Sequence, residues 1–314
     1  MNILCLDHFH PKGIEYLKKE GFDVDDYDNF DAANLPNNIN TYDGLIIRSK
    51  TTLTKQTIER MTNLKIIGRA GVGLGNLDIE AATKNNIAIV NCPTANSIST
   101  AEYTMGMIVS MVRFIATSHL SMREGLWEKN KFIGMELYRK TLGIIGFGNV
   151  GQKVAKIAKN GFDMQVLTYD PYKEDTVIRA SHIKSVTLNE LLATSDIITI
   201  HTSVTHETKR FIDKDFFSKM KDGVCIVNCG RGDLIDSQDL LSALESGKVN
   251  LAALDVYDVE PPDLSQKLLR HDRVITTPHL AGATREAHER VGLDLAEKIS
   301  LFLKTGFTPG IINR

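Results

Sequence analysis

An arginine, a glutamate and a histidine each follow closely on an apolar run that has the composition of a buried strand. Arg231 lies between two glycines in Asn228-Cys229-Gly230-Arg231-Gly232. Glu260 directly precedes two prolines, which restrict its backbone, and His279 follows Thr277-Pro278. A guanidinium exposed in this way can hold a carboxylate through two parallel hydrogen bonds. Taken alone, Arg231 could be a surface arginine that flanks a helix, and a lone histidine such as His279 is usually structural; the combination of the three residues indicates a functional site.

A second set of residues has the spacing of a phosphate-binding turn. The apolar run 142–145 leads into Gly146-Phe147-Gly148-Asn149-Val150-Gly151, and residues 152–159 then carry apolar side chains at helical spacing. Gly146 can make the turn, Gly148 leaves no side chain between the backbone and a pyrophosphate, and Gly151 lets helix and strand pack closely. The phosphates would lie at the positive end of the helix.

An acidic residue follows this turn at the distance expected for a ribose ligand. Residues 165–169 read as the next strand and end at Asp170, which is 170 − 151 = 19 residues after the last glycine. A carboxylate there binds a ribose 2′-hydroxyl and repels a 2′-phosphate, so the sequence favours NAD over NADP. The alternative is a glycine turn in an α/β protein that binds no nucleotide.

Cationic side chains gather in the first third of the chain. Arg48, Lys50 and Arg69 lie at or just past two predicted strands and could form a cationic rim for a substrate phosphate. The alternative is that Arg48 binds only a carboxylate and that Lys50 is solvated. The nearby Gly71-x-Gly73-x-Gly75 does not complete a nucleotide motif because residue 76 is Asn, and we interpret it as a close backbone approach to the substrate.

The elements that position these residues alternate between strand and helix, which predicts parallel sheets. Strands are expected at 2–7, 42–50, 64–68 and 87–91, and again at 142–145, 165–169, 197–201, 224–228, 251–255 and 274–277. In open parallel sheets ligands bind at the carboxyl ends of the strands. The polar residues predicted at such ends are Arg48, Arg69, Asp170, His201, Arg231, Asp255 and His279.

The segment Cys92-Pro93-Thr94-Ala95 interrupts the alternation and predicts a hinge. A long apolar helix is expected from about 97 to 117, and a terminal helix at 284–304 is expected to return to the first domain. The predicted fold is α/β, with two doubly wound parallel-sheet domains and a cleft between them. A flavodoxin-like substrate-binding domain is expected at 1–94 and 285–314, and a Rossmann NAD-binding domain at 95–284.

Composition limits the possible partners. The 314 residues carry a net charge of −2, which suggests neither nucleic acid nor an anionic membrane as a partner. No apolar run approaches the ~20 residues of a membrane span, and the N-terminus lacks the pattern of a signal peptide, so a cytoplasmic protein is expected. The four cysteines form no Cys-x-x-Cys pair and are expected to be reduced; no metal is predicted.

From about Arg48 to Glu297 the chain resembles the D-isomer-specific 2-hydroxyacid dehydrogenases. The resemblance rests on Gly146–Gly151 with Tyr169-Asp170-Pro171, and on the segments around Arg231, Asp255, Glu260 and His279 quoted above. A subgroup acting on a phosphorylated substrate is suggested by Ile47-Arg48-Ser49-Lys50-Thr51, by Gly68–Gly73 before Asn76-Leu77-Asp78, and by Trp127-Glu128-Lys129 with Phe132.

The resemblance implies a role for each matched residue. His279 would take the hydroxyl proton in the oxidative direction, Glu260 would favour its imidazolium form, and Arg231 would hold the substrate carboxylate; these three form the catalytic set. The cofactor set is Gly146, Gly148, Asn149, Val150, Gly151, Asp170, Pro171, His201, Thr202, Cys229, Arg231, Asp255, His279 and Gly282, with Asp255 at the nicotinamide carboxamide. The substrate set is Arg48, Lys50, Arg69, Gly71, Val72, Arg231 and His279.

The implied reaction is NAD-dependent oxidation of D-3-phosphoglycerate to 3-phosphohydroxypyruvate, the first step of serine synthesis. A reductase of glyoxylate or hydroxypyruvate is the alternative enzyme, and an NAD-sensing corepressor is a more remote one. The resemblance also implies a homodimer through the NAD-binding domain, in which Lys129 and Lys131 could reach a neighbouring subunit's site. Because the sequence ends at Arg314, regulation through a C-terminal serine-sensing domain is not expected.

Overall fold

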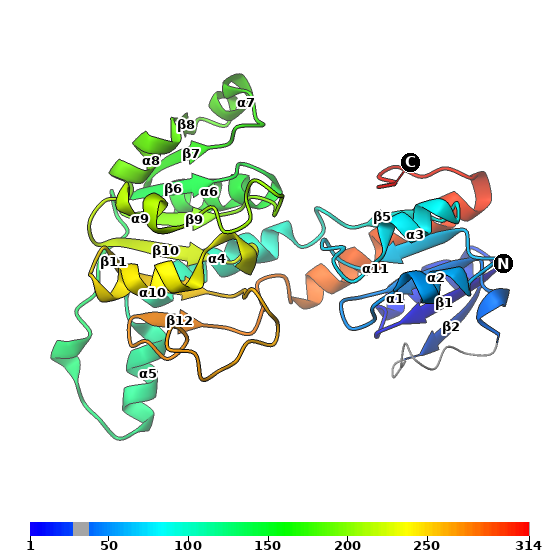
Figure 1. Ribbon diagram of the computed structural model, residues 1–314, viewed down its shortest axis with the longest axis horizontal. Coiled ribbons are helices and arrows are strands. Elements are labelled where there is room, and N and C mark those ends of the chain that lie inside the picture. Colours follow the sequence, from blue (N-terminus) through cyan, green and yellow to red (C-terminus); the bar gives the residue numbers. More distant parts are fainter. Residues whose placement is uncertain (28–37, 314) are drawn as a thin grey trace. The chain divides into compact units, whose positions relative to one another are not determined.

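The computed structural model describes residues 1–27 and 38–313. The chain divides into two compact units, the first formed by residues 1–96 and 283–314 and the second by residues 97–282. Each unit is an α/β layer structure built on its own parallel sheet (Figure 1).

The first unit contains a five-stranded sheet in the order β2-β1-β3-β4-β5, and every strand pair is parallel. This is the strand order of flavodoxin-like sheets, as the sequence predicted, with the order reversing between β1 and β3. The strands are β1 (Asn2–Leu6), β2 (Asp23–Tyr27), β3 (Gly44–Ile47), β4 (Ile66–Arg69) and β5 (Ala88–Asn91). The helices are α1 (Pro11–Lys19), the 3-10 turn η1 (Ile39–Thr41), α2 (Lys55–Glu59), α3 (Ile79–Lys84) and α11 (Arg285–Thr305).

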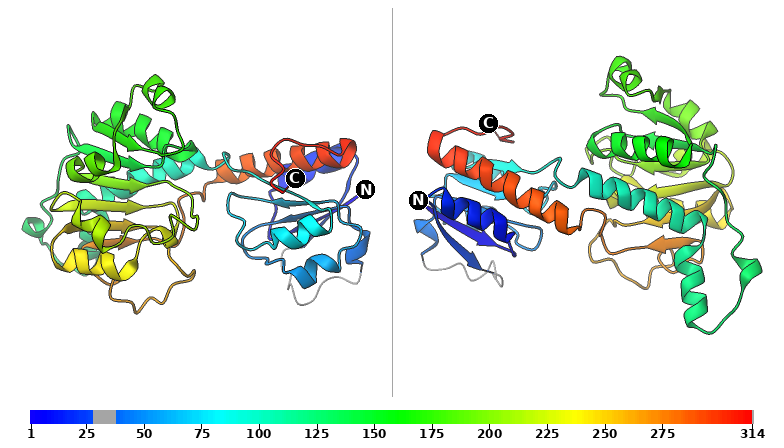
Figure 2. Two further views of the ribbon diagram at one scale, coloured as in Figure 1. Left: turned by 45° about the horizontal axis from the view of Figure 1, so that its top comes forward. Right: turned by 180° about the vertical axis from the view of Figure 1, so that it is seen from behind.

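Helices cover both faces of this sheet because its central strands are apolar on both sides. Alternate residues of β1 point to opposite faces, so Ile3 packs in the cluster with α1 and α11 whereas Leu4 packs in the cluster with α2 and α3. Figure 2 shows α11 lying beside α1. Thr284 caps α11, and Gly306 ends it in a left-handed conformation.

The second unit contains a seven-stranded parallel sheet in the order β12-β11-β10-β9-β6-β7-β8. Counted from β6, this is the Rossmann order 3-2-1-4-5-6 with one further strand, and the order reverses between β6 and β9. The strands are β6 (Thr141–Ile145), β7 (Gln165–Tyr169), β8 (Lys184–Ser185), β9 (Ile197–Ile200), β10 (Val224–Asn228), β11 (Val249–Leu254) and β12 (Val274–Thr276). The helices are α4 (Ser97–Val112), α5 (Ile115–Arg123), η2 (Lys129–Lys131), α6 (Asn149–Phe162), α7 (Asp175–Ala180), α8 (Leu188–Thr194), α9 (Lys214–Ser218), η3 (Gly232–Leu234) and α10 (Ser237–Glu245).

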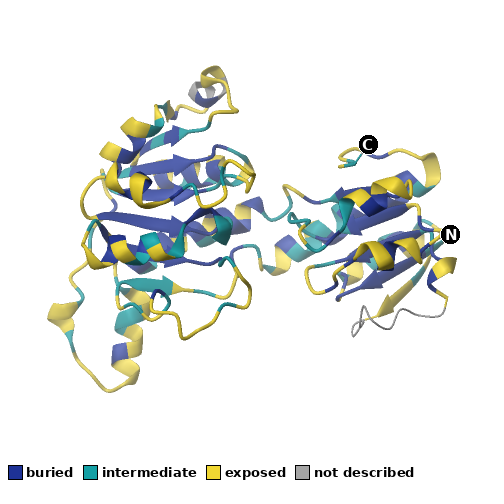
Figure 3. Cartoon of the chain, in the orientation of Figure 1, coloured by how far each residue is buried: buried dark blue, intermediate teal, exposed yellow. Residues whose placement is uncertain are grey.

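Two apolar clusters enclose the second sheet. One contains α4 and α6, and the other contains α8, α9 and α10. Figure 3 shows the central strands buried and the outer faces of the helices exposed. Cys225 and Cys229 lie in the first of these clusters, and all four cysteines of the chain are buried and free. The four thiols are therefore unpaired, as expected for reduced cysteines.

Three elements differ from the sequence-based expectation, among them the two-residue strand β8, which was not predicted. The helix predicted from 97 to 117 ends at Val112, because Phe114 adopts a left-handed conformation and a separate helix, α5, begins at Ile115. The strand β2 was not predicted, since its sequence Asp-Val-Asp-Asp-Tyr is polar and largely exposed at the sheet edge. Among the described residues no single helix is long and apolar enough to cross a membrane; α4 and α5 reach that composition only together, across a 60° bend.

Candidate active site

The loop that follows β10 holds Arg231 through a buried asparagine. Asn228 is 1% exposed, its Oδ1 accepts from the Gly230 N–H at 3.0 Å, and its Nδ2 donates to the Arg231 carbonyl at 2.8 Å. The Arg231 guanidinium donates to the Gly230 carbonyl at 2.7 Å. Gly232 lies so close to the next loop that a Cβ there would stand 2.0 Å from the Tyr257 carbonyl carbon. The Arg231 loop is therefore pressed against the loop that carries Glu260.

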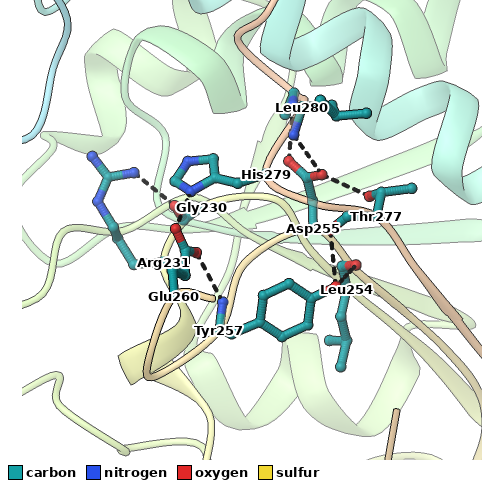
Figure 4. A network of polar contacts seen from close by, with 10 residues as sticks. Gly230, Arg231, Leu254, Asp255, Tyr257, Glu260, Thr277, His279 and Leu280 are labelled. Carbon is teal, nitrogen blue, oxygen red and sulfur yellow. Dashed lines mark hydrogen bonds and ion pairs between the residues drawn. The ribbon is translucent and has the colours of Figure 1, made fainter. Parts of the chain in front are cut away.

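Glu260 and His279 form a direct pair. The Glu260 Oε2 lies 2.6 Å from the His279 Nδ1, and the Glu260 Oε1 accepts from the Tyr257 N–H at 3.1 Å. Figure 4 shows this pair and the Arg231 side chain together. Both partners are partly exposed, with 37% of the Glu260 and 48% of the His279 side chain accessible. An imidazole that donates from Nδ1 to a carboxylate keeps its Nε2 available to accept a proton from a reacting group or to return one.

Asp255 organises the loop that carries His279. Its carboxylate is completely buried and accepts from the Thr277 hydroxyl at 2.6 Å and from the Leu280 and Ala281 N–H groups at 2.8 Å each. The His279 N–H donates to the Asp255 carbonyl at 2.9 Å, and His279 itself has a φ of 53°. A non-glycine residue held in this left-handed region costs conformational energy, so the surrounding bonds must fix it there. The Asp255 carboxylate accepts three hydrogen bonds from the segment 277–281 and so positions His279.

The glycine turn after β6 has one glycine that packing does not require. A Cβ at Gly146 would lie 2.7 Å from the His201 carbonyl carbon, and one at Gly151 would lie 2.2 Å from the Gly146 oxygen. At Gly148, the N-cap of α6, a Cβ would have no neighbouring atom within 4 Å. Protein packing therefore explains Gly146 and Gly151, whereas the open space at Gly148 fits a ligand that lies against the backbone.

Asp170 ties this turn to the end of β7. Its Oδ2 accepts from the Phe147 N–H at 2.8 Å, and its Oδ1 accepts from the Tyr172 N–H at 2.9 Å. The carboxylate is thus fixed beside the glycine turn, which is where a ribose hydroxyl ligand is required. Asn149 and Val150 begin α6 directly after the turn, and Pro171 is exposed beside Asp170.

The remaining residues predicted to bind the cofactor differ in their surroundings. The His201 Nε2 lies 3.0 Å from the Thr199 hydroxyl, and burial lowers the pKa of His201 to about 4. Thr202 is partly exposed, and its backbone N lies 2.8 Å from the position of a Gly146 Cβ. The side chain of Cys229 packs in the core, where burial raises the pKa of its thiol to about 12. Gly282 is partly exposed and is the last residue of the second unit.

The first unit presents the predicted substrate residues on clamped loops. The Asp7 carboxylate accepts from the N–H groups of Arg48 at 3.0 Å and Thr51 at 2.9 Å, and from the Thr51 hydroxyl at 2.7 Å. From the other side, the Asn76 Nδ2 donates to the carbonyls of Arg48 at 2.7 Å and Thr51 at 2.6 Å. Asp7 follows β1 and Arg48 follows β3, the pair at which the strand order reverses. Such a point is where ligands bind in this type of sheet.

Lys50 is exposed within this clamped loop, and Arg69 ends the neighbouring strand β4. The Arg69 guanidinium donates to the Ala70 carbonyl at 3.1 Å. Gly71 has a φ of 149°, and a Cβ there would stand 1.8 Å from the Arg69 Nη1. The carbonyl of Val72 accepts from the Asn91 side chain at 2.7 Å. Gly71 is thus required for the Arg69 side chain to lie across the backbone.

Comparison with known proteins identifies the family. Residues 105–281 match the family described as D-isomer specific 2-hydroxyacid dehydrogenase, NAD binding domain. The chain belongs to this family. It is 43% identical over 299 residues to D-3-phosphoglycerate dehydrogenase of Archaeoglobus fulgidus, covering 95% of this chain and 56% of that relative. It is 45% identical over 259 residues to hydroxypyruvate reductase of Thermotoga maritima, covering 82% of this chain and 83% of the relative.

Among solved structures, a glyoxylate reductase from Paecilomyes thermophila is 27% identical, with a TM-score of 0.87 and coverage of 99% of this chain and 98% of that one. The chain spans little more than half the length of the Archaeoglobus fulgidus relative. The second unit of this 2-hydroxyacid dehydrogenase corresponds to the family's NAD-binding domain, which confirms the expected fold class and NAD as the cofactor. Within residues 1–27 and 38–313, no cluster of three or more metal-binding side chains occurs.

Sequence reasoning missed the side chains that hold the site loops in place. These are Asp7, Asn76, Asn228 and Tyr257, whose hydroxyl donates to the Thr277 carbonyl at 2.8 Å. Asp7 was visible as the acidic last residue of a predicted strand, and Asn76 as the residue that interrupts the second glycine pattern. Asp7 is 41 residues and Asn76 is 28 residues away from Arg48, the residue that both of them bind. No local sequence pattern could reveal contacts over such separations.

Proposed function

We propose that the protein is an NAD-dependent dehydrogenase that oxidises D-3-phosphoglycerate to 3-phosphohydroxypyruvate, the first step of serine synthesis. The observation that carries this proposal is the Arg231, Glu260 and His279 constellation in the second unit, combined with a clamped Arg48 loop at the strand-order reversal of the first. The Archaeoglobus fulgidus relative named for this activity supports the choice of substrate.

The second unit supplies the acid–base chemistry. In the oxidative direction the His279 Nε2 accepts the proton of the substrate hydroxyl, while Nδ1 keeps its hydrogen bond to Glu260. The negative charge of Glu260 stabilises the imidazolium that forms, and the Tyr257 N–H holds Glu260 in place. Arg231 binds the substrate carboxylate and polarises the oxygen on which charge develops. In the reverse direction protonated His279 returns the proton.

When bound, NAD would supply the hydride acceptor that this reaction requires. The residues that would hold it are the glycine turn, where Gly148 leaves room for the pyrophosphate, and Asp170, which would bind the adenosine ribose. The backbones of His201, Thr202 and Cys229 follow β9 and β10 at the same sheet edge, and we assign them to the cofactor site together with Asn149, Val150, Pro171, Asp255 and Gly282.

The first unit supplies the charge that distinguishes a phosphorylated substrate. Arg48 and Lys50 stand on the loop held by Asp7 and Asn76, and Arg69 ends the next strand. We assign these three cations, with the backbone at Gly71 and Val72, to the substrate's anionic groups. A fixed loop loses little conformational entropy on binding, which favours discrimination between substrates with and without a phosphate.

The test is NADH oxidation with 3-phosphohydroxypyruvate, hydroxypyruvate and glyoxylate at one pH and salt concentration. A preference of ~100-fold in kcat/KM for the phosphorylated substrate is expected, roughly 2.7 kcal/mol of transition-state binding. Arg48→Ala should remove most of that preference. As a control, Lys84→Ala should keep it, because Lys84 forms an exposed ion pair on a helix of the same unit. Equal rates without the phosphate would contradict this substrate assignment.

A reductase of hydroxypyruvate or glyoxylate is the second candidate. The relative from Thermotoga maritima named hydroxypyruvate reductase matches this chain over 83% of its own length, more than the phosphoglycerate dehydrogenase relative does. The same acid–base set would serve this reaction. The substrate comparison above separates the two, because only the first candidate requires a contribution from the phosphate.

We also propose a cytoplasmic homodimer formed through the NAD-binding unit. In that unit α5 and the segment after it extend from the sheet (Figure 3) and expose large apolar side chains, among them Trp127 and Ile133 at 80% each. Exposed apolar area of this kind is typical of an interface with a second copy. Trp127→Glu should therefore give a monomer in sedimentation experiments. Lys129 is exposed on the same segment, and in a dimer it could reach the substrate site of the neighbouring subunit. Unchanged affinity of Lys129→Ala for the phosphorylated substrate would contradict that role.

A further inference from the structure

The side chain of Arg48 is oriented by a histidine from the far end of the sequence. The backbone of Arg48 is fixed by Asp7 and Asn76, so only its side chain is left free to move. The Arg48 Nη2 lies 3.1 Å from the Nε2 of His288, on α11, and the Arg48 Nη1 lies 3.5 Å from the His8 carbonyl oxygen. Both contacts lie within the first unit.

The chemistry of the two groups fixes the proton on the imidazole. A guanidinium stays protonated throughout the accessible pH range and has no acceptor atom, so the Arg48 Nη2 must donate. The His288 Nε2 can accept this bond only when it carries no proton, which places the hydrogen of the neutral ring on Nδ1. Protonation of the ring would replace this hydrogen bond with a contact between two cations.

We propose that His288 is a positioning residue: as a neutral imidazole it holds the Arg48 guanidinium in place for the substrate's anionic group, and when protonated it releases it. This inference rests on the proposed function, in which Arg48 binds that group. It adds a residue to the site and gives substrate affinity a dependence on acid.

The charged groups around His288 favour its neutral form. Partial burial, followed by the charge of Arg48 and then that of His10, lowers the pKa of His288 below its ordinary value. His10 caps α1, which packs against α11, and the neighbouring ion pair Lys12–Glu289 links the same two helices. The strand β4 also packs on α11 and brings the cation Arg69, whereas β5 carries no charged residue. Release of Arg48 is therefore expected only in mildly acidic solution.

The experiment measures KM and kcat for 3-phosphohydroxypyruvate between pH 5 and 8 in the wild-type protein and in two variants. His288→Leu removes the acceptor and should raise KM about tenfold at neutral pH with little change in kcat, as for loss of a hydrogen bond to a charged group. This difference from the wild type should shrink in acid, where the protonated ring of the wild type no longer holds Arg48. His288→Gln keeps an uncharged acceptor and should keep the wild-type KM at neutral pH. In acid the wild-type KM should rise relative to that of His288→Gln; the titration of the substrate phosphate cancels in this ratio.

Two controls separate this effect from a general disturbance of α1 and α11. His10→Asn keeps a capping acceptor and removes the nearby titrating group, and it should retain the acid dependence of the wild type. Glu289→Gln weakens the adjacent ion pair with Lys12 and should do the same. Loss of the acid dependence in His10→Asn would show that protonation of His10, and not of His288, causes the rise in KM, and it would overturn the proposal.

A second readout needs no substrate. Nitrogen–proton correlation spectra of the imidazole rings, assigned by the signal missing in His288→Gln, should show His288 with its proton on Nδ1 at neutral pH. A proton on Nε2, or a wild-type KM that falls in acid relative to His288→Gln, would overturn the proposal, since His288 would then bind the anion directly. If the protein turns over no phosphorylated substrate, the proposed function fails, and the ring tautomer still decides whether His288 holds Arg48.

Discussion

Two glycines in the same turn should respond in opposite ways to substitution by alanine. A Cβ at Gly151 would lie 2.2 Å from the Gly146 oxygen, within a turn of buried backbone, whereas a Cβ at Gly148 would meet no atom within 4 Å. The φ of Gly148 is −78°, which lies outside the left-handed region that favours glycine. Gly151→Ala therefore tests packing, and Gly148→Ala tests the space that we assign to the cofactor.

The magnitudes follow from these distances. Overpacking at Gly151 should lower the free energy of unfolding by ~1–3 kcal/mol, and each kcal/mol corresponds to roughly 2–4 °C in Tm for a domain of this size. Gly148→Ala should leave Tm unchanged or raise it slightly, because alanine restricts the unfolded chain by up to ~1 kcal/mol at a compatible position. Its effect should instead appear in binding, where a methyl group against the pyrophosphate should weaken NADH at least ~10-fold, about 1.4 kcal/mol.

The assay combines thermal unfolding without cofactor and NADH titration followed by its fluorescence. Gly148→Ala should unfold like the wild type and bind NADH poorly; Gly151→Ala should unfold earlier, and any loss of binding there should accompany the loss of stability. Wild-type NADH affinity in Gly148→Ala would refute the placement of the pyrophosphate at this turn. A lower Tm in Gly148→Ala would show instead that packing does require this glycine.

Three further predictions concern single side chains. His279→Ala should abolish turnover while NADH binding persists, and Glu260→Gln, which keeps an acceptor for the Tyr257 N–H but loses the charge, should lower kcat ~10–100-fold; near-normal rates in either variant would end the proposed proton transfer. Asp170→Ala should relax discrimination against NADP and also loosen the turn that it holds through the Phe147 N–H, so an unchanged ratio of NAD to NADP affinity would exclude it from the ribose site. Burial lowers the pKa of His201 from 6.5 to about 4, so between these values the unfolded chain binds more protons than the folded protein, and the free energy of unfolding should fall as the pH is lowered through this window. Urea titrations at pH 7 and 5 should show a smaller loss in His201→Asn than in the wild type, and an equal loss would contradict the neutral buried ring.

The sequence predicted those features that local patterns encode. Apolar runs located the central strands, and the glycine spacing located the turn before α6, because each depends on residues close together in the chain. The break at Phe114 and the polar edge strand β2 have no such pattern, since a left-handed residue and edge pairing depend on surrounding structure. For the site, the motifs gave residue identities, but the clamps by Asp7, Asn76 and Asn228 depend on distant pairing or on loop geometry.

Three aspartates share one structural role that the individual motifs do not reveal. Asp7, Asp170 and Asp255 follow directly on β1, β7 and β11, and each accepts N–H groups from the loop after the adjacent strand, β3, β6 and β12 respectively. Those three loops carry Arg48, the glycine turn and His279. A carboxylate is suited to this role because it accepts several backbone N–H bonds and donates none.

At these three strand ends, the aspartate fixes the neighbouring loop. In Asp255→Asn the amide nitrogen would face a backbone N–H in either orientation, because each Asp255 oxygen accepts one. At Asp7 both N–H groups bind the same oxygen, so an asparagine could keep them and alanine is the informative substitution. Asp255→Asn should disturb His279 and lower kcat, whereas Asp7→Ala should disturb Arg48 and raise KM for an anionic substrate with little change in kcat. Loss of the carboxylate at equivalent positions of two sheets should thus affect different kinetic constants, because the loop that each carboxylate holds has a different task.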